Sequence, residues 1–148
     1  MISLDSNLLL FAYNVNAPPH QKAFKFIERL QQRSDVIISE FALIEFYRLL
    51  RNSVVVQNPL NAPEAADVIA QYRGHPRWKL TGFPDQSVPV HEATWKTAAE
   101  PEFAYRRIFD ARFALVLRHF GVTEFATANV KDFQGFGFQR VWNPLLEE

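Results

Sequence analysis

Short apolar runs alternate with longer helix-like segments along the whole chain, and this alternation constrains the fold more than any other feature. Runs of this length that are rich in β-branched and other apolar residues are typical of buried strands. Strands separated by helices predict a parallel sheet covered on both faces. We therefore predict one three-layer α/β/α domain over residues 1–148, with a short and mainly parallel central sheet. The β-prone runs are residues 1–4, 35–39, 78–81, 123–128 and 139–143.

The segments between these runs have apolar residues at the spacing of amphipathic helices. Ser6 is the expected N-cap of the first helix, and Gly121 is suited to end the last one. In the second helix, Phe24, Ile27 and Leu30 form the expected core face. The predicted helices cover residues 7–13, 20–33, 41–51, 63–72, 89–99 and 102–120.

Composition excludes several classes of protein. The chain has no cysteine, which excludes disulfides and cysteine-bound zinc. Its 16 Lys and Arg balance 16 Asp and Glu, unlike a strongly basic nucleic-acid-binding domain. The sequence has neither a signal-peptide pattern nor an apolar window long enough to span a bilayer. We therefore expect a cytoplasmic protein that does not enter a membrane.

Four acidic residues, Asp5, Glu45, Asp110 and Asp132, lie at the edges of the apolar segments. Asp5 ends the first run, and Asp132 follows the run at 123–128. Ligands of parallel α/β folds bind at the carboxyl ends of the strands, and right-handed connections bring the starts of the helices there too. Four converging carboxylates repel one another unless a divalent cation neutralises them. The pattern predicts a Mg²⁺ site of the kind that cleaves phosphate esters.

Each acid also has a structural interpretation. Any one of them could be a salt-bridge residue or an acid at a helix start, and Asp110 could pair with Arg106 or Arg107. Arg112 lies close to Asp110 in sequence, and its guanidinium fork could contact an RNA phosphate. The four histidines share no spacing that indicates a ligand set.

Five short motifs carry a resemblance to a known family. They are Leu4-Asp5-Ser6-Asn7-Leu8-Leu9, Ser39-Glu40-Phe41-Ala42-Leu43-Ile44-Glu45-Phe46, Phe109-Asp110-Ala111-Arg112-Phe113-Ala114, Thr127-Ala128-Asn129-Val130-Lys131-Asp132-Phe133 and Val141-Trp142-Asn143-Pro144. In order and spacing they resemble the PIN-domain family, and specifically the VapC-type ribonuclease toxins of bacterial toxin–antitoxin pairs. The resemblance covers essentially the whole chain.

The resemblance implies roles for particular residues. Asp5, Glu45 and Asp110 match the metal-binding acids of the family. Many relatives have Asp where this chain has Asn129, so Asp132 supplies the fourth carboxylate here, while Asn129 contributes a neutral oxygen or shapes the turn. The expected supporting residues are Ser6, Asn7 and Thr127.

The resemblance also implies an activity and partners. We expect a Mg²⁺- or Mn²⁺-dependent endoribonuclease that a small cognate antitoxin inhibits, with tRNA among the candidate substrates. A homodimer is expected as well. The aromatic side chains available for a surface shared between subunits include Phe11, Tyr13, Phe46 and Tyr47.

Two other classes of function compete with a nuclease. Enzymes that form an aspartyl-phosphate also use an Asp after the first strand, but the dehalogenase type needs a second Asp where Asn7 lies. A catalytically inactive PIN-like module could bind RNA or a partner protein, although the presence of all the acids opposes this alternative. Nucleotide-cofactor enzymes are disfavoured because neither glycine-rich phosphate-binding motif occurs.

Overall fold

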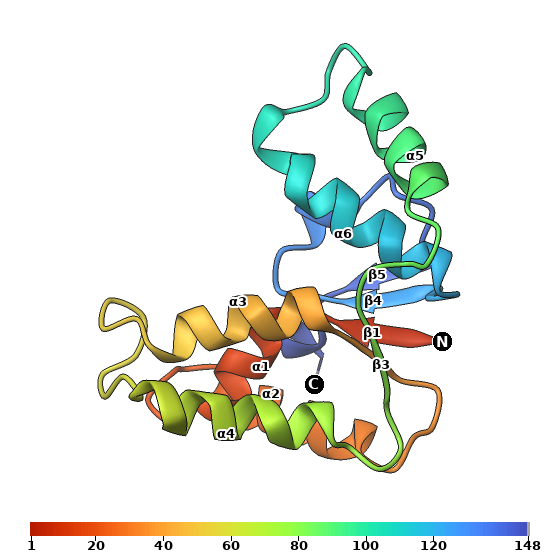
Figure 1. The fold of residues 1–148 in the computed structure, drawn as a ribbon. Helices are drawn as coiled ribbons and strands as arrows, with labels where there is room; N and C mark the ends of the chain where they lie inside the picture. Colours follow the sequence, from red (N-terminus) through yellow and green to blue (C-terminus); the bar gives the residue numbers. More distant parts are fainter. Residues whose placement is uncertain (148) are drawn as a thin grey trace.

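A computed structural model describes residues 1–147, and its central layer consists of short parallel strands (Figure 1). Two parallel ladders, β1-β4-β5 and β2-β3, are joined by an isolated parallel bridge between Ile2 and Val36. The resulting strand order is β3-β2-β1-β4-β5. All pairs are parallel, and the chain adds strands on one side of β1 first and then, from β4 on, on the other side. The strands are β1 (Ile2–Leu4), β2 (Ile37–Ser39), β3 (Lys79–Thr81), β4 (Glu124–Ala126) and β5 (Arg140–Trp142).

Helices cover both faces of the strands. The first four helices pack together on one face, and α6 covers the other, with α5 outside it and farthest from the strands (Figure 1). This arrangement confirms the predicted three-layer fold with a short parallel sheet. The helices are α1 (Ser6–Tyr13), α2 (His20–Leu30), α3 (Glu40–Leu50), α4 (Ala62–Arg73), α5 (Val88–Ala98), α6 (Ile108–His119) and α7 (Val130–Phe133), with 3₁₀ turns η1 (Tyr105–Arg107) and η2 (Pro144–Leu146).

Each helical layer has its own apolar core against the strands. Leu8, Leu9 and Phe46 are fully buried between the first four helices and the sheet. Leu117 and Phe125 are fully buried on the α6 side. The two cores fix the helices that carry Glu45 and Asp110 to opposite faces of the same strands.

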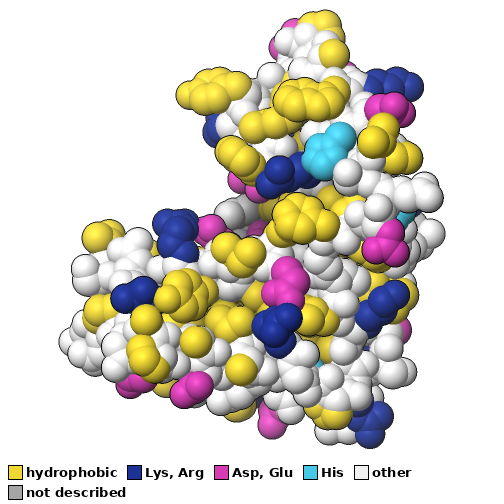
Figure 2. Space-filling model, viewed as in Figure 1, with side chains coloured by type: hydrophobic (Ala, Val, Ile, Leu, Met, Phe, Trp, Pro, Cys, Tyr) yellow, Lys and Arg dark blue, Asp and Glu magenta, His cyan; other side chains and the backbone are white. Residues whose placement is uncertain are grey.

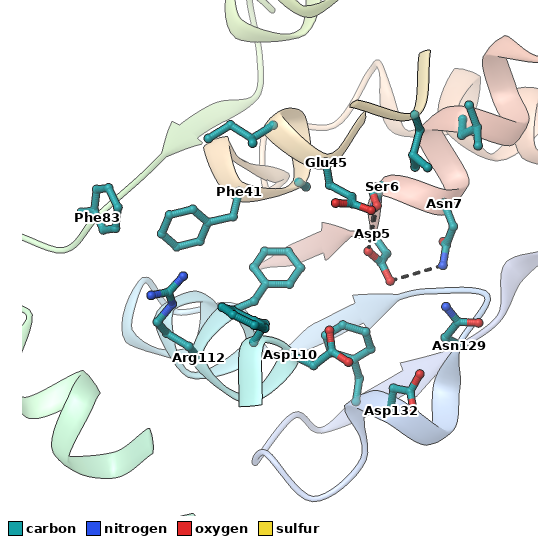
Figure 3. Close-up of a pocket in the computed structure, with 17 residues that line it drawn as sticks. Asp5, Ser6, Asn7, Phe41, Glu45, Phe83, Asp110, Arg112, Asn129 and Asp132 are labelled. Carbon is teal, nitrogen blue, oxygen red and sulfur yellow. Dashed lines mark hydrogen bonds between the residues drawn. The ribbon is translucent and has the colours of Figure 1, made fainter. Parts of the chain in front are cut away.

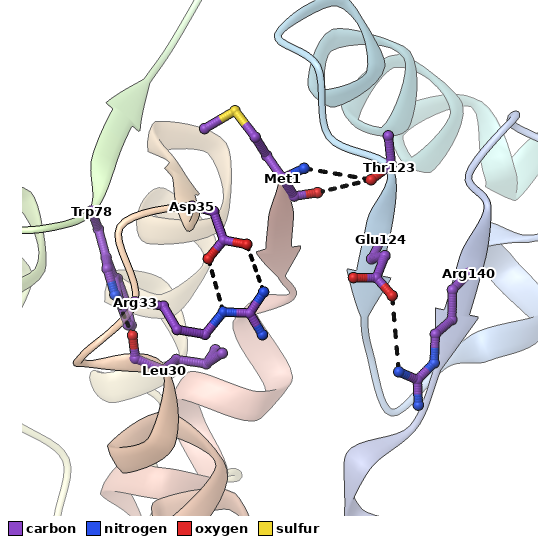
Figure 4. Close-up of polar contacts among 8 residues, drawn as sticks. All are labelled: Met1, Leu30, Arg33, Asp35, Trp78, Thr123, Glu124 and Arg140. Atoms are coloured by element: carbon purple, nitrogen blue, oxygen red, sulfur yellow. Dashed lines mark hydrogen bonds and ion pairs between the residues drawn. The ribbon is translucent and has the colours of Figure 1, made fainter.

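The amino ends of the strands are closed by paired polar groups (Figure 4). Arg33 and Asp35 form an ion pair at 2.6 Å just before β2. Arg140 approaches Glu124 to 3.9 Å, between the first residues of β5 and β4. The indole nitrogen of Trp78 donates to the carbonyl of Leu30 at 3.0 Å. The charged side chains at this end of the sheet are therefore paired with partners of opposite charge.

Two local predictions, the start of α1 and the core face of α2, were wrong. Helix α1 begins at Ser6 rather than at Asn7, because Asp5 has extended backbone angles and its carboxylate caps the Ser6 N–H. The core face of α2 includes Phe26 rather than Phe24, which is exposed. The buried positions Ala23, Phe26, Ile27 and Leu30 follow the spacing of one helix face.

The segment predicted as one helix over 102–120 is interrupted. Ala104 has extended backbone angles, so α6 begins only at Ile108, after the single turn η1. The helix ends as expected at Gly121, whose φ of 90° lies in the left-handed region. Helix α7 was not predicted, because a single turn gives no periodic signal. Within residues 1–147, no helix combines the length and apolar character needed to cross a membrane.

Candidate functional site

A cleft of about 760 Å³ opens at the carboxyl ends of β1 and β4 (Figure 3). It lies where the strand order reverses, which is the usual ligand position in open parallel sheets. The cleft brings together residues far apart in sequence, and Thr127 is buried behind it. The predicted site residues that line it are Asp5, Ser6, Asn7, Glu45, Asp110, Arg112, Asn129 and Asp132.

Asp5 is held in place in the cleft by several hydrogen bonds. Its backbone N–H donates to the Ala126 carbonyl at 2.9 Å, which ties the end of β1 to the end of β4. Its Oδ1 accepts from the Ser6 N–H at 2.8 Å, and its Oδ2 accepts from the Thr127 hydroxyl at 2.7 Å. Burial raises the pKa of the Asp5 carboxyl, although hydrogen bonds from Thr127 and Ser6 oppose that shift. The carboxylate is therefore held in one orientation at a cost in desolvation.

Asn7 links the two strand ends through its side-chain amide. Its Nδ2 donates to Asp5 Oδ2 at 3.3 Å, and its Oδ1 accepts from the Ala128 N–H at 3.3 Å. The Thr127 hydroxyl in turn accepts from the Asn129 N–H at 3.0 Å. The predicted supporting residues thus form one network that orients Asp5 and the chain leading to Asn129.

Asp110 lies in the first turn of α6 and faces the cleft. Burial raises its pKa to about 6, and the negative charges of Asp5 and Asp132 add to the shift. Within residues 1–147 it forms no ion pair, so the predicted alternative of pairing with Arg106 or Arg107 is wrong. The positive charge of Arg107 offsets part of the rise in the Asp110 pKa, but no cationic side chain of the described chain forms an ion pair with Asp110.

Arg107 has another role, which the sequence did not reveal. Its guanidinium donates to the Asp132 carbonyl at 3.2 Å and to the Gln134 carbonyl at 2.8 Å. It also lies 4.8 Å from the ring centroid of Phe136. These contacts hold the segment that carries Asp132 against the start of α6. They join residues 25 and 27 positions apart, so no local pattern could have indicated them.

Glu45 differs from the other acids because it has a cationic partner. Arg48 lies 2.6 Å from its carboxylate, and 45% of the Glu45 side chain is exposed. The ion pair has i,i+3 spacing, which the sequence does display. The negative charge of Glu45 still raises the pKa of both Asp5 and Asp110. Glu45 therefore belongs to the acidic cluster but sits on its most open side.

The last motif places two oxygen-bearing side chains in the cleft (Figure 3). Asn129 is the residue before α7, and Asp132 lies inside that helix. In Figure 3 Asn129 faces the Asn7 side of the cleft, whereas Asp132 faces the Asp110 side. The effect of Asp132 on the pKa of Asp110 agrees with this placement.

The donor set suits a hard divalent cation. Carboxylate and amide oxygens line the cleft, and Mg²⁺ prefers oxygen ligands while retaining several of its waters. Within the described chain, however, no group of three or more His, Cys, Asp or Glu side chains stands close enough together to hold a metal ion as the side chains are placed. The donor types therefore match a divalent cation, whereas the spacing of the side chains does not form a ready ligand set.

Comparison with known proteins places this site in a family. No family model matches the chain. Ribonuclease VapC24 of Mycobacterium tuberculosis, from strains CDC 1551 / Oshkosh and ATCC 25618 / H37Rv, is 47% identical over 148 residues, covering 100% of this chain and 99% of the relative. The chain belongs to the VapC ribonuclease family. The resemblance found in the sequence is thereby confirmed.

Solved structures of VapC and Fit proteins share the fold. VapC20 of Mycobacterium tuberculosis, described as a sarcin-ricin loop cleaving toxin, has a TM-score of 0.62 at 19% identity, over 84% of this chain and 87% of that one. FitAB bound to a DNA fragment has a TM-score of 0.64 at 17% identity, over 100% and 98%. FitAcB from Neisseria gonorrhoeae has a TM-score of 0.65 at 16% identity, over 97% and 98%. These likenesses support the PIN-like fold of the VapC chain.

Proposed function

We propose that this VapC-family protein is a metal-dependent endoribonuclease whose reaction takes place in the cleft between β1 and β4. One observation carries the proposal. Asp5 is buried and held by hydrogen bonds at the bottom of a cleft lined by three further carboxylates. Burying and clustering acids destabilises a protein unless a cation compensates for their charge. The family is one of ribonucleases, which gives such a cluster a chemical use.

The proposed carboxylate ligands of Mg²⁺ or Mn²⁺ are Asp5, Glu45, Asp110 and, as the fourth, Asp132. When bound, such an ion activates water and stabilises charge on a phosphate. To help hold such an ion, Glu45 would have to give up its ion pair with Arg48. Asn129 contributes a neutral oxygen or shapes the turn before α7.

The side chains of the cleft contribute orientation and charge. Ser6, Asn7 and Thr127 fix the direction of the Asp5 carboxylate. Arg112 is the proposed contact to an RNA phosphate. It lines the cleft, and within residues 1–147 it takes part in no ion pair that would occupy its guanidinium.

A small cognate antitoxin, a homodimer and a cytoplasmic location belong to the same proposal. Comparison structures named FitAB and FitAcB give a fold-level precedent for a complex. The aromatic residues expected to form the dimer surface need correction, because Phe46 is fully buried in the core. Val88 and Trp95 on α5 are exposed apolar side chains better placed for such a contact. Sedimentation at tens of micromolar should show a dimer, and a monomer alone would contradict this part.

The nuclease proposal is tested by single-turnover cleavage of a tRNA pool in Mg²⁺ or Mn²⁺. Wild-type protein should cleave, and both EDTA and Asp5→Asn should abolish cleavage. Cleavage that persists in EDTA or in Asp5→Asn would overturn the metal-nuclease proposal. Transfer of phosphate from a small phosphodonor to the wild-type protein, without RNA cleavage, would favour an aspartyl-phosphate enzyme instead.

A further inference from the structure

One side of the acidic cleft is built from aromatic rings rather than from charged groups. Phe41, Phe83, Phe109 and Phe113 line the same cleft as the four acids, and we call these four residues the aromatic wall. Phe83 and Phe109 are 72% and 73% exposed, although each has a large apolar surface to bury. Figure 2 shows hydrophobic side chains gathered around the hollow between α3 and the α5–α6 pair. The nuclease reaction as proposed above leaves this surface without a role.

Within the aromatic wall, Phe41 packs against neighbouring rings, whereas Phe83 and Phe109 are largely exposed. The rings of Phe41 and Phe83 are 5.0 Å apart at 70°, and those of Phe41 and Phe113 are 6.4 Å apart at 74°. Edge-to-face packing of this kind holds the rings in fixed relative orientations. The Arg112 guanidinium lies 5.8 Å from the centroids of both Phe41 and Phe109 (Figure 3). A second flat, stackable group is therefore held among the rings.

Electrostatics alone gives this cleft little attraction for RNA. The chain has a formal net charge of zero, and the cleft itself concentrates carboxylates. Proteins that bind single-stranded nucleic acid supplement phosphate contacts by stacking bases on aromatic side chains, and Arg planes act in the same way. Exposed rings beside a phosphate-cleaving centre match that mode of binding.

We propose that Phe83 and Phe109 stack unpaired bases next to the scissile phosphate, with Arg112 fixed between the rings as part of the same surface. This inference rests on the nuclease function proposed above. The bases have to be unpaired, because a base inside a duplex cannot present its face to a side chain without leaving the stack. A second copy of the chain is the less favoured occupant, because covering Phe83 and Phe109 would also close the cleft that has to admit the substrate.

The test combines protein and substrate changes in one cycle. The cleavage site in a susceptible RNA is mapped first, and abasic nucleotides are then placed at the positions flanking it. Single-turnover kcat/KM is measured for wild type, Phe83→Ala and Phe109→Ala on both RNAs. Phe24→Ala is the matched control, because Phe24 is a phenylalanine that is 50% exposed on α2 and lies outside the cleft.

Each Phe→Ala change should reduce kcat/KM by about 5- to 150-fold, mainly through KM, which corresponds to the loss of one stacked base. With the wild-type protein, replacing the intact RNA by the abasic RNA should reduce kcat/KM by a similar factor. With the variant that lacks the stacking ring for that base, the same replacement should reduce kcat/KM little further. Phe→Tyr and Phe→Trp should restore cleavage, whereas Phe→Leu should not. Phe24→Ala should cleave like wild type, and thermal unfolding should show that all variants are folded.

Three results would overturn the stacking assignment. The first is a kcat/KM for a Phe→Ala variant on abasic RNA that falls by the product of the two separate losses, which would show that ring and base act independently. The second is full restoration of cleavage by Phe→Leu. The third is a change in sedimentation of Phe83→Ala or Phe109→Ala with unchanged cleavage, which would make the wall an interface between copies. If Asp5→Asn is inactive while both Phe→Ala variants cleave normally, only the stacking assignment fails. If Asp5→Asn still cleaves, the nuclease proposal itself fails.

Discussion

The two ends of the sheet treat carboxylates in opposite ways. At the amino ends, Asp35 pairs with Arg33, and this contact lowers the Asp35 pKa. At the carboxyl ends, burial raises the pKa of Asp5 and of Asp110, and neighbouring acids add to the shift. Paired acids stabilise the native state, whereas clustered acids oppose it. This difference is the one expected if the acids at the carboxyl end bind the proposed metal ion and the acids at the amino end stabilise the fold.

The largest expected effect is on RNA cleavage, which should depend on the acids at the carboxyl end of the sheet and not on those at the amino end. Glu45→Gln and Asp110→Asn should each reduce single-turnover RNA cleavage by about 1,000-fold, the scale of losing a metal ligand. RNA affinity should be largely unchanged, because it depends on phosphate and base contacts rather than on these acids. Asp35→Asn is the matched control at the amino end and should leave cleavage unchanged. Equal losses of cleavage from Asp35→Asn and Asp110→Asn would contradict the proposed difference between the two ends of the sheet.

A second comparison is internal to the carboxyl end. Asp132→Ala should reduce cleavage by about 100-fold or more, because it removes a charged ligand, whereas Asn129→Ala should cost about tenfold or less. The two substitutions are compared in the same cleavage assay at matched Mn²⁺ concentrations. A larger loss from Asn129→Ala would reassign the fourth ligand and leave the rest of the site intact.

The third prediction concerns the support behind Asp5. Thr127→Val removes a buried 2.7 Å hydrogen bond to the Asp5 carboxylate while keeping the side-chain shape. It should lower the free energy of unfolding by about 1–3 kcal/mol and cleavage by about 10- to 100-fold. Thr123→Val is the control, because the Thr123 hydroxyl contacts Met1 at the opposite end of the strand. Normal cleavage by Thr127→Val would show that Asp5 needs no orientation from this side.

The smallest expected effect is a difference in stability that changes with pH. The Asp110 pKa is about 6 in the folded chain against an ordinary value of 3.8, so its charge destabilises the folded protein increasingly between these values and fully above them. Because Asp110 is only half-buried, solvent screening reduces this penalty to about 1–2 kcal/mol. In EDTA, Asp110→Asn should therefore match wild type at low pH and exceed it at pH 7.

Asp35→Asn should behave in the opposite sense. Its pKa is lowered in the folded chain, so its contribution is present at neutral pH and is lost as the pH falls through the folded-state value. The pair is exposed, so removing it should cost at most about 1 kcal/mol at pH 7. Urea unfolding across pH measures both variants. A loss of several kcal/mol from Asp110→Asn in EDTA would make Asp110 a structural residue.

Much of the site could be predicted from the sequence because it follows from strand ends. Asp5 and Asp132 follow strands, and a parallel sheet brings such positions to one edge. The helix-borne acids could be predicted because Asp110 leads the apolar positions Ala114 and Leu117, both of which are buried. Periodicity and strand topology were sufficient for these residues.

The remaining features depend on contacts that have no local signal. The bonds from Arg107 to the α7 segment cross a long sequence separation, and the aromatic wall joins residues from α3, the loop after β3 and α6. Whether an aromatic residue is buried, as Phe46 is, or exposed, as Phe83 is, depends on tertiary packing. Composition indicated a surplus of aromatic side chains but not which of them would reach the surface.

Isothermal titration of Mn²⁺ into the metal-free protein tests the central claim most directly, since it measures the proposed metal site without relying on RNA. Wild type and Asp35→Asn should bind Mn²⁺ with the same affinity and stoichiometry, whereas Asp5→Asn should show no comparable binding. Binding should also raise the stability of wild type to unfolding in proportion to the Mn²⁺ concentration above its Kd. Equal Mn²⁺ binding by Asp5→Asn and wild type, or none by a folded wild-type protein, would contradict the assignment of a metal centre to the carboxyl end of the sheet.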